Sequence, residues 1–169
     1  QLSRIVFDKT GTLTLGRPEM TVLHSFGDSR HALAVAAALA SRSDHPLDRI
    51  LAQSAANEGL TAPALADFAA TPGSGLSGTI DGALHVLGNA AFLISAGVPQ
   101  DAIDAALRNH VPEDAQSIVW LARAGYGLLA VFGFADQARP GLSEMLERLA
   151  RFGIAVTVLS GDRGPSVAA

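Results

Sequence analysis

The stretch Ile5-Val6-Phe7-Asp8-Lys9-Thr10-Gly11-Thr12-Leu13-Thr14 decides the fold of this chain. The apolar run Ile5 to Phe7 predicts a short buried strand that ends in the carboxylate of Asp8. Ligands of open α/β sheets bind just beyond the carboxyl ends of the strands, so Asp8 is expected at a reactive edge. An aspartate can attack the terminal phosphoryl group of ATP and form an aspartyl-phosphate, and this is the chemistry that Asp8 predicts.

The residues after Asp8 suit a phosphoryl site. Thr10 and Thr12 supply hydroxyl donors, and Gly11 allows backbone N–H groups to approach phosphate oxygens. Lys9 adds a positive charge that is expected near the phosphate or at a hinge. The alternative is a strand followed by an ordinary polar turn.

The full string from Asp8 to Thr14 resembles the phosphorylation signature of the P-type ATPases, within the haloacid dehalogenase-like superfamily. The resemblance implies that Asp8 is phosphorylated and that Asp8 and the Thr10 carbonyl form part of a Mg²⁺ site. Related phosphatases carry a second Asp two residues on, as the general acid/base that hydrolyses the intermediate. Thr10 stands there in this chain, so the phosphoenzyme is expected to persist, as a pump cycle requires.

Composition narrows the function classes. The chain has 169 residues, of which 49% are hydrophobic and 17% charged, which is enough for a core and too apolar for disorder. The formal charge is −4 and no basic block is present, so we expect no nucleic-acid partner. The absence of cysteine excludes disulfides. The most apolar stretch, 32–40, is shorter than the roughly 20 residues that cross a bilayer and predicts a buried helix.

A second motif predicts a nucleotide site. Ser43-Asp44-His45-Pro46 opens a predicted helix over 46–57, and it resembles the Ser-Glu-His-Pro motif of the nucleotide-binding domain in heavy-metal-transporting P-type ATPases. The resemblance implies that His45 contacts adenine and that Asp44 replaces the family's Glu. The family also has a Glu five positions before this His, where Ala40 stands here. Asp44 or Asp48 could substitute for it, and the sequence leaves both open.

Glycines mark a further part of this site. Gly73-Ser74-Gly75 precedes two predicted short strands around the Asp81-Gly82 turn, an arrangement that argues against a Rossmann dinucleotide site. The resemblance implies that Gly73 and Gly75 contact the nucleotide, with a simple hairpin turn as the alternative. It also places the pair Gly88 and Asn89 beside the nucleotide, although Asn89 alone predicts only a helix N-cap.

The end of the chain returns to the first strand. After predicted strands over 116–122 and 126–135, the string Asp136 to Pro140 resembles the family's D-x-x-R-P return into the phosphorylation domain, with Pro140 in the first turn of a helix. That helix is expected to present one buried face and to precede a parallel strand over 154–159. The face comprises Leu142, Met145, Leu146 and Leu149.

The final motif, Ser160-Gly161-Asp162, resembles the superfamily's Thr-Gly-Asp. The resemblance implies that the Ser160 hydroxyl bonds the phosphoryl group. Gly161 and Asp162 are expected to make phosphate, nucleotide or hinge contacts. The family's later Lys and its Gly-Asp-Gly-x-Asn-Asp string do not follow, and the chain begins without Met, so we expect a segment of a longer polypeptide.

Together these features predict an α/β fold of two domains. A haloacid dehalogenase-like, Rossmannoid phosphorylation domain, incomplete at its C-terminus, comprises 1–16 and 136–169. An α+β nucleotide-binding domain, an antiparallel sheet flanked by helices, comprises 17–135. The expected function is the ATP-binding and phosphorylation region of a pump that exports heavy-metal cations, with ATP and Mg²⁺ as cofactors, and little turnover by this chain alone.

The expected partners are ATP, an actuator domain of the same polypeptide, and a metal cation carried by membrane helices outside this chain. The expected place is the cytosolic face of a bacterial plasma membrane. Two alternatives stay open: a soluble haloacid dehalogenase-like phosphatase, and a nucleotide-binding module without catalysis. The transported metal cannot be inferred from these residues.

Overall fold

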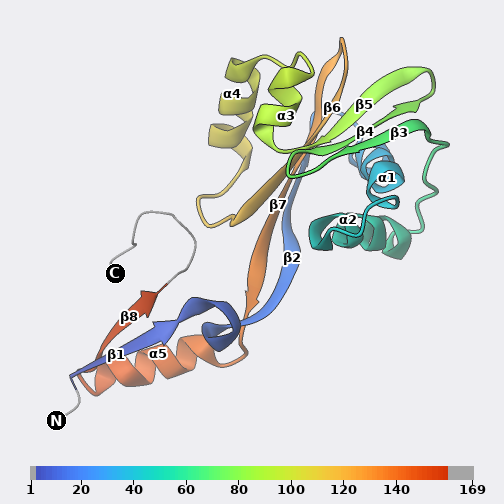
Figure 1. Ribbon diagram of the computed structural model, residues 1–169. Coiled ribbons are helices and arrows are strands. Elements are labelled where there is room, and N and C mark those ends of the chain that lie inside the picture. The colour runs from blue at the N-terminus through green and yellow to red at the C-terminus, as the bar shows by residue number, and fades with distance from the viewer. Residues whose placement is uncertain (1–2, 160–169) are drawn as a thin grey trace. The chain divides into compact units, whose positions relative to one another are not determined.

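The computed structural model describes residues 3–159 and divides the chain into two compact units (Figure 1). Unit 1 contains 1–18 and 136–169, and unit 2 contains 19–135. Two strands, β2 (Thr14–Ser25) and β7 (Gly127–Ala138), have residues in both units. The sequence placed the divisions at 16/17 and 135/136, and the roles assigned to the two domains stay predictions.

Unit 1 is built on two parallel strands. β1 (Arg4–Asp8) pairs with β8 (Ala155–Leu159), and Asp8 lies opposite Leu159 in the register. Between them in the sequence stands α5 (Leu142–Arg151), which packs against β8. A single tight turn, η1 (Lys9–Leu13), follows Asp8. The predicted strand–helix–strand order is therefore present, and it brings the ends of the two strands together. The prediction that β1 is buried was wrong: Ile5 and Phe7 are half-buried and Val6 is 52% exposed, because among the described residues only β8 pairs with this strand.

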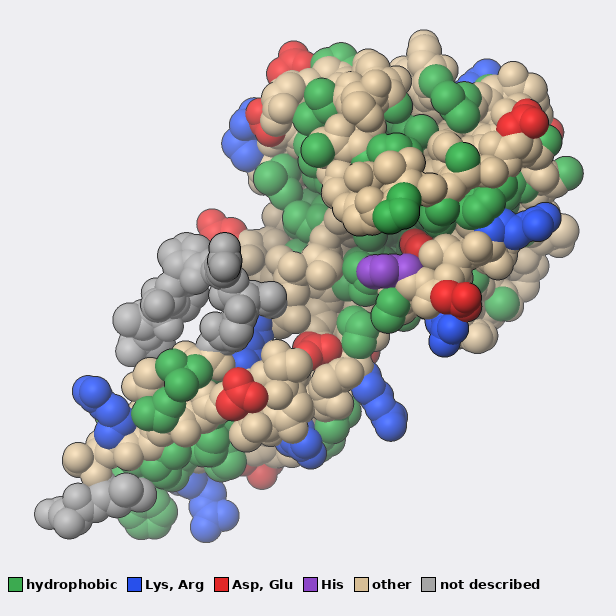
Figure 2. Space-filling view, viewed as in Figure 1, with side chains coloured by type: hydrophobic (Ala, Val, Ile, Leu, Met, Phe, Trp, Pro, Cys, Tyr) green, Lys and Arg blue, Asp and Glu red, His purple; other side chains and the backbone are tan. Residues whose placement is uncertain are grey.

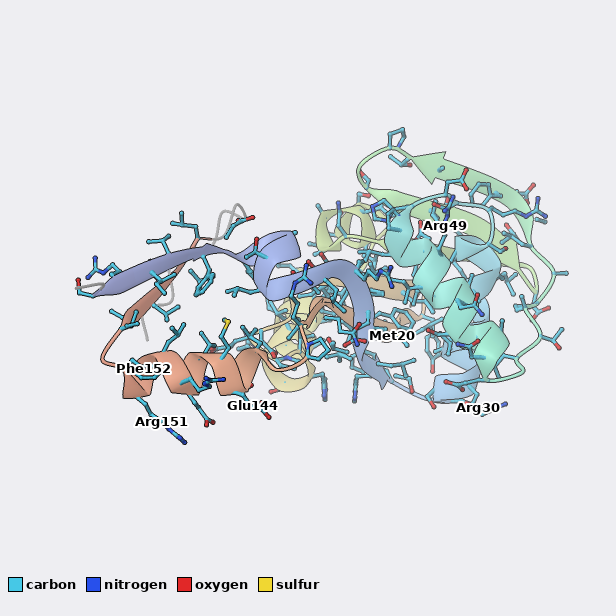
Figure 3. The ribbon with its side chains drawn as sticks, turned by 90° about the horizontal axis from the view of Figure 1, so that it is seen from below. Met20, Arg30, Arg49, Glu144, Arg151 and Phe152 are labelled. Carbon is cyan, nitrogen blue, oxygen red and sulfur yellow. The ribbon has the colours of Figure 1, made fainter. Side chains whose placement is uncertain are left out.

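Two expectations about α5 were wrong. Pro140 precedes the helix, which begins at Leu142 after Gly141 in a left-handed conformation with φ 77°. The predicted apolar face is not buried: Leu142, Leu146 and Leu149 are half-buried and Met145 is 36% exposed. Among the residues described, only β1 and β8 form a sheet beside this helix, which is too little to cover the whole face. In Figure 3, Glu144 and Arg151 point away from the strands.

Unit 2 contains a six-stranded sheet in the order β2-β7-β6-β5-β4-β3. Its remaining strands are β3 (Ala66–Thr71), β4 (Gly75–Ile80), β5 (Ala83–Gly88) and β6 (Ser117–Arg123). Neighbours from β3 to β7 pair antiparallel, with Asp81 and Gly82 as the predicted turn between β4 and β5. The sequence Gly16-Arg17-Pro18 alone indicates a break before a strand over 20–24. In the structure β2 continues through these residues, because an edge strand tolerates glycine and proline.

Helices cover both faces of this sheet (Figure 1). α1 (Ser29–Ala40) and α2 (Pro46–Asn57) lie on one face, and α3 (Ala90–Ser95) and α4 (Gln100–His110) on the other. The bounds of α2 match the predicted helix over 46–57. None of the helices between residues 3 and 159 is long and apolar enough to cross a membrane.

Strand alternation divides the core into two clusters. Leu87, Leu121 and Phe132 pack with α1 and α2, whereas neighbouring residues on the same strands, such as Trp120 and Val131, pack with α3 and α4. Successive side chains of a strand point to opposite faces, so a sheet covered by helices on both sides buries consecutive residues. Trp120 and Phe132, large apolar side chains for which the sequence alone predicts core positions, are buried, at 3% and 0% exposure. The strands β4, β5 and β6 of this sheet also contribute residues to a cavity in unit 2.

Candidate active site

The first site lies at the end of β1 in unit 1. Asp8 is exposed at the carboxyl end of the strand, followed by half-buried Lys9 and exposed Thr10. Thr10 has an extended backbone, with φ −75° and ψ 121°, and Gly11 adopts φ 81°. The chain therefore reverses at once after the carboxylate, and the positive φ at Gly11 explains why glycine stands there.

Arg139 holds this turn from 127 residues further along the chain. Its Nε donates to the Thr12 carbonyl oxygen at 2.8 Å, and its Nη2 donates to the Gly11 carbonyl oxygen at 2.7 Å. The Arg139 backbone N–H donates to the Leu13 carbonyl oxygen at 3.0 Å. A guanidinium group presents several N–H donors in a planar fork, so one side chain fixes two successive carbonyls.

A second connection runs through Thr14, which is 6% exposed. Its Oγ1 donates to Lys9 O or Asp136 Oδ2, at 3.3 and 3.1 Å, and accepts from the Gly11 N–H at 3.3 Å. The D-x-x-R-P string therefore holds the turn after Asp8 through both its Asp and its Arg. The sequence identified this string only as the return of the chain. The structural roles of Thr14 and Arg139 were missed because they depend on contacts between distant segments.

The motif Ser160-Gly161-Asp162 lies outside the described residues. The pairing of Asp8 with Leu159 places the residue before Ser160 beside the candidate nucleophile. Between residues 3 and 159, no cluster of three or more His, Cys, Asp or Glu side chains could hold a metal ion. The predicted Mg²⁺ ligands in this range are the Asp8 carboxylate and the Thr10 carbonyl, oxygen donors of the kind Mg²⁺ prefers.

The second site is a cavity of about 390 Å³ in unit 2. It lies among the start of α2, the turn between β3 and β4, the end of β5 and the middle of β6. Polar and glycine residues form one part of its wall and aliphatic side chains the other. The lining residues are Ser43, His45, Asp48, Ala70, Thr71, Pro72, Gly73, Ser74, Gly75, Leu76, Leu87, Gly88, Asn89, Ile118 and Val119.

Five of the six predicted nucleotide residues line this cavity, namely His45, Gly73, Gly75, Gly88 and Asn89. Asp44 does not line it. The Asp44 side chain is 98% exposed and accepts from Arg49 Nη2 at 2.9 Å. Arg49 projects from α2 in Figure 3.

His45 is the N-cap of α2. Its Nδ1 accepts from the Leu47 backbone N–H at 3.3 Å, so the proton of the neutral ring is on Nε2. Pro46 follows in the first turn, where its missing N–H costs nothing. The helix start therefore fixes the imidazole at the mouth of the cavity, with a donor available to a ligand.

Glycine is required in the cavity wall for two different reasons. Gly75 and Gly88 lie opposite each other on β4 and β5. A Cβ atom on Gly75 would lie 2.4 Å from Leu87 O, and one on Gly88 would lie 2.3 Å from Ser74 O. Gly73 has φ +70° and open space around it. Close packing of the strands therefore requires Gly75 and Gly88, whereas a turn conformation beside the cavity requires Gly73.

Asn89 joins this turn to α3. Its Oδ1 accepts from the Phe92 N–H at 2.9 Å, which confirms the predicted N-cap, and its Nδ2 donates to Gly73 O at 3.1 Å. Its backbone N–H donates to Ser74 O at 2.9 Å. Both polar ends of the side chain are thus engaged in the protein, and Asn89 shapes the cavity wall.

Electrostatics distinguish one buried residue outside the cavity. His85 is 5% exposed, and its Nδ1 lies 2.9 Å from Ala83 O. Burial lowers the pKa of His85; the Ala83 carbonyl opposes this, Arg123 and His31 lower the pKa further, and Asp81 raises it.

Figure 2 shows acidic and basic side chains scattered over the visible face of unit 2, with no basic patch.

A family model for haloacid dehalogenase-like hydrolases matches residues 2–169. The chain belongs to this family. The predicted haloacid dehalogenase-like fold with an inserted antiparallel domain is thereby confirmed.

Curated relatives of the family are matched along almost the whole chain. Nitrogen fixation protein FixI of Rhizobium meliloti (strain 1021) is 34% identical over 169 residues, which are 100% of this chain and 20% of that protein. The probable copper-transporting ATPase SynA of Synechococcus elongatus is 38% identical over 168 residues, 96% of this chain and 20% of that protein. The copper-exporting P-type ATPase B of Archaeoglobus fulgidus is 30% identical, with 95% and 23% covered.

Solved structures of the family agree. A zinc-transporting PIB-type ATPase in its E2.Pi state is 27% identical with a TM-score of 0.79, covering 98% of this chain and 26% of that one. The catalytic domain of the CPx-ATPase CopB-B, which changes conformation upon nucleotide binding, is 26% identical with a TM-score of 0.67, covering 96% and 55%. These matches confirm the resemblance to heavy-metal-transporting P-type ATPases. The chain spans about a fifth of the length of the curated relatives.

Proposed function

We propose that this chain is the ATP-binding and phosphorylation region of an ATP-driven pump for heavy-metal cations. The observation that carries the proposal is the arrangement at Asp8. An exposed carboxylate ends a strand, and the turn after it is fixed by Arg139 and by Asp136 through Thr14. The similarity to two copper-transporting ATPases over at least 95% of the chain supports it.

In this proposal the cavity of unit 2 holds the nucleotide. The aliphatic wall suits the face of a base, and the imidazole of His45 stacks on the base or donates to it through Nε2. Gly73 lies in open space, so phosphate or ribose groups can approach its backbone. Gly75, Gly88 and Asn89 keep the wall in shape.

The phosphoryl step follows from the chemistry of a carboxylate. An Asp8 oxygen forms a bond to the γ-phosphorus of ATP while the bond from that phosphorus to the β,γ-bridging oxygen breaks. ADP leaves with the electron pair, and an acyl phosphate stays on Asp8. Thr10 stands where related phosphatases carry a general acid/base and cannot activate a water in that role, so hydrolysis of the acyl phosphate is slow.

Two further groups complete the proposal. The Asp8 carboxylate and the Thr10 carbonyl would hold Mg²⁺, which offsets the charge of the transferring phosphoryl group when bound. Lys9 and the Ser160 hydroxyl, with Gly161 and Asp162 near it, are proposed contacts of the phosphate or of the hinge.

The whole pump would supply what this chain lacks. We propose that the region faces the cytosol, that membrane helices elsewhere in the polypeptide carry the metal cation, and that an actuator domain hydrolyses the acyl phosphate. The energy stored in the acyl phosphate then drives export.

Titrating the chain with ATP tests the first part of the proposal. We expect NMR shifts of His45 and Gly75 that saturate, and His45→Ala should weaken ATP binding by about tenfold, in line with the loss of one stacking contact and hydrogen bond. Shifts spread over the surface without saturation, or equal affinity in the variant, would contradict the proposed nucleotide site.

A further inference from the structure

Asp48 is the buried acidic side chain of the described part of the chain. It lies in the first turn of α2, is 9% exposed, and lines the cavity together with His45. The cavity wall contains no other acidic side chain and no Lys or Arg. Asp48 is therefore the one negative charge that the described residues direct to this cavity.

Its carboxylate has no partner among residues 3–159. No described N–H or O–H group donates to it, and none of the ion pairs includes it. No described side-chain oxygen is both fully buried and without a partner, so the carboxylate oxygens of Asp48 are open to solvent through the cavity that Asp48 lines. An ionised carboxylate accepts hydrogen bonds only, and removing it from water without a donor costs free energy. A ligand that fills the cavity therefore has to donate a hydrogen bond to Asp48 or leave its carboxylate without a partner.

Local helix chemistry does not account for the residue. In a capping box, an acidic or amide side chain at this position reaches back to the backbone N–H of the N-cap residue. Here the His45 N–H donates to Ser43 Oγ at 3.2 Å instead. What is left is the attraction between a carboxylate and the helix N-terminus, which an exposed side chain would provide equally well.

The structure also distinguishes between Asp44 and Asp48, the two carboxylates that could replace the family's Glu at the position of Ala40. Ala40 is 1% exposed within the α1 core cluster and does not line the cavity. Asp44 is paired with Arg49 outside the cavity. Asp48 alone of the three lies in the wall, one helical turn from His45.

Resting on the proposed function, we propose that Asp48 accepts a hydrogen bond from the exocyclic amino group of the nucleotide base. The aliphatic wall of Leu76, Leu87, Ile118 and Val119 fits the face of any purine. The Asp48 carboxylate, in contrast, distinguishes purines by whether their edge carries an amino group. An amino-bearing purine satisfies it. A purine without that group leaves it buried and unpaired, which is the stronger penalty.

The experiment compares ATP, GTP and purine riboside 5′-triphosphate, which lacks the amino group, on the full 169-residue chain by calorimetric titration. For the wild type we expect ATP to bind about tenfold more tightly than purine riboside triphosphate, from one charge-assisted hydrogen bond in an open cavity. In Asp48→Ala the ratio should fall to about one, because neither nucleotide then meets a carboxylate. Asp44→Ala is the matched control and should keep the ratio of the wild type.

The ratio, rather than the affinity, is the readout, because removal of a negative charge also eases binding of any triphosphate. Asp48→Asn keeps an acceptor oxygen and should retain part of the preference, which distinguishes recognition from a change in helix stability. If GTP binds more tightly than ATP and Asp48→Ala removes that advantage, the carboxylate still reads the amino edge and the base is guanine.

An unchanged ratio in folded Asp48→Ala would overturn the inference while leaving the nucleotide site in place. Failure of the wild type to bind any of the three triphosphates would instead contradict the proposed function.

Discussion

At the scale of single residues, the shape of the cavity depends on two glycines as much as on the side chains that line it. Gly75 and Gly88 allow β4 and β5 to approach until an added Cβ would meet backbone atoms at 2.3–2.4 Å. Backbone atoms cannot rotate away as a long side chain can. The two strands, and with them the cavity wall, therefore require glycine at both positions.

Gly75→Ala should destabilise the chain by about 1–3 kcal/mol, as overpacking of a close-packed site does. Chemical denaturation with urea measures it. Gly27→Ala is the control, because its Cβ would meet nothing within 4 Å and its φ is not positive. Equal stability of Gly75→Ala and wild type would show that the strands can separate without loss.

His85 should make the stability depend on pH. Its pKa is lowered in the folded chain, mainly by burial, so below the unfolded value of 6.5 the unfolded state binds more protons. Stability should be unaffected by this group above pH 6.5 and fall as the pH decreases below it. Urea denaturation at pH 7.5 and 5.5 should show a smaller difference in His85→Gln than in wild type. The exposed His31→Gln should keep most of the difference, and an unchanged difference in His85→Gln would contradict the account.

The sequence predicted Asp8 as the candidate nucleophile and His45 as a candidate nucleotide contact, because short motifs carry both. It could not decide between Asp44 and Asp48. Asp44 and Asp48 are only four residues apart in the sequence. Which of them lines the cavity depends on how α2 packs in the folded unit. The sequence also predicted ligand contact for Gly75 and Gly88. The structure adds a steric reason for glycine at these positions, the close approach of β4 and β5, which depends on strand pairing and cannot be inferred from the sequence.

At the scale of elements, the turn η1 is held by contacts from the far end of the chain. Arg139 bonds the Gly11 and Thr12 carbonyls, and Thr14 connects Asp136 to the Gly11 N–H. The turn lacks a regular helical backbone at Thr10 and Gly11, so its own hydrogen bonds do not determine its shape. Its geometry should therefore follow Arg139.

Arg139→Gln should raise amide hydrogen exchange across residues 9–14 by about tenfold, through loss of two bonds from a charged donor at an exposed site. Mass spectrometry of the corresponding peptides measures it. Arg148→Gln, on α5, is the matched control because no described contact connects Arg148 to the turn. Equal protection in wild type and Arg139→Gln would mean that the turn is stable by itself.

The helices and strands show where the spacing of apolar residues is sufficient to predict burial and where it is not. The sequence predicted strands over 116–122 and 126–135, and helices on both faces of the sheet explain why consecutive residues such as Trp120 and Leu121 are buried. The spacing of apolar residues on α5 equally predicted a buried face, but Met145 is 36% exposed. Periodicity identifies the face of a helix and leaves open what covers it.

At the scale of the whole molecule, nucleotide binding and turnover depend on different groups. Thr10 supplies no acid/base for hydrolysis, and the described Mg²⁺ ligands are only part of an octahedral set. The 169-residue chain should therefore bind ATP and release phosphate from ATP or from p-nitrophenyl phosphate no faster than Asp8→Asn does. Steady release from the monoester that Asp8→Asn abolishes would favour a phosphatase instead.

The most direct test of the central claim is to supply γ-³²P-labelled ATP to the full-length protein that contains this chain and follow the label. We predict a label that survives acid, is released by hydroxylamine as an acyl phosphate is, and is absent from Asp8→Asn. A protein that binds ATP without acquiring label, or a label that persists in Asp8→Asn, would contradict the claim that Asp8 accepts the phosphoryl group.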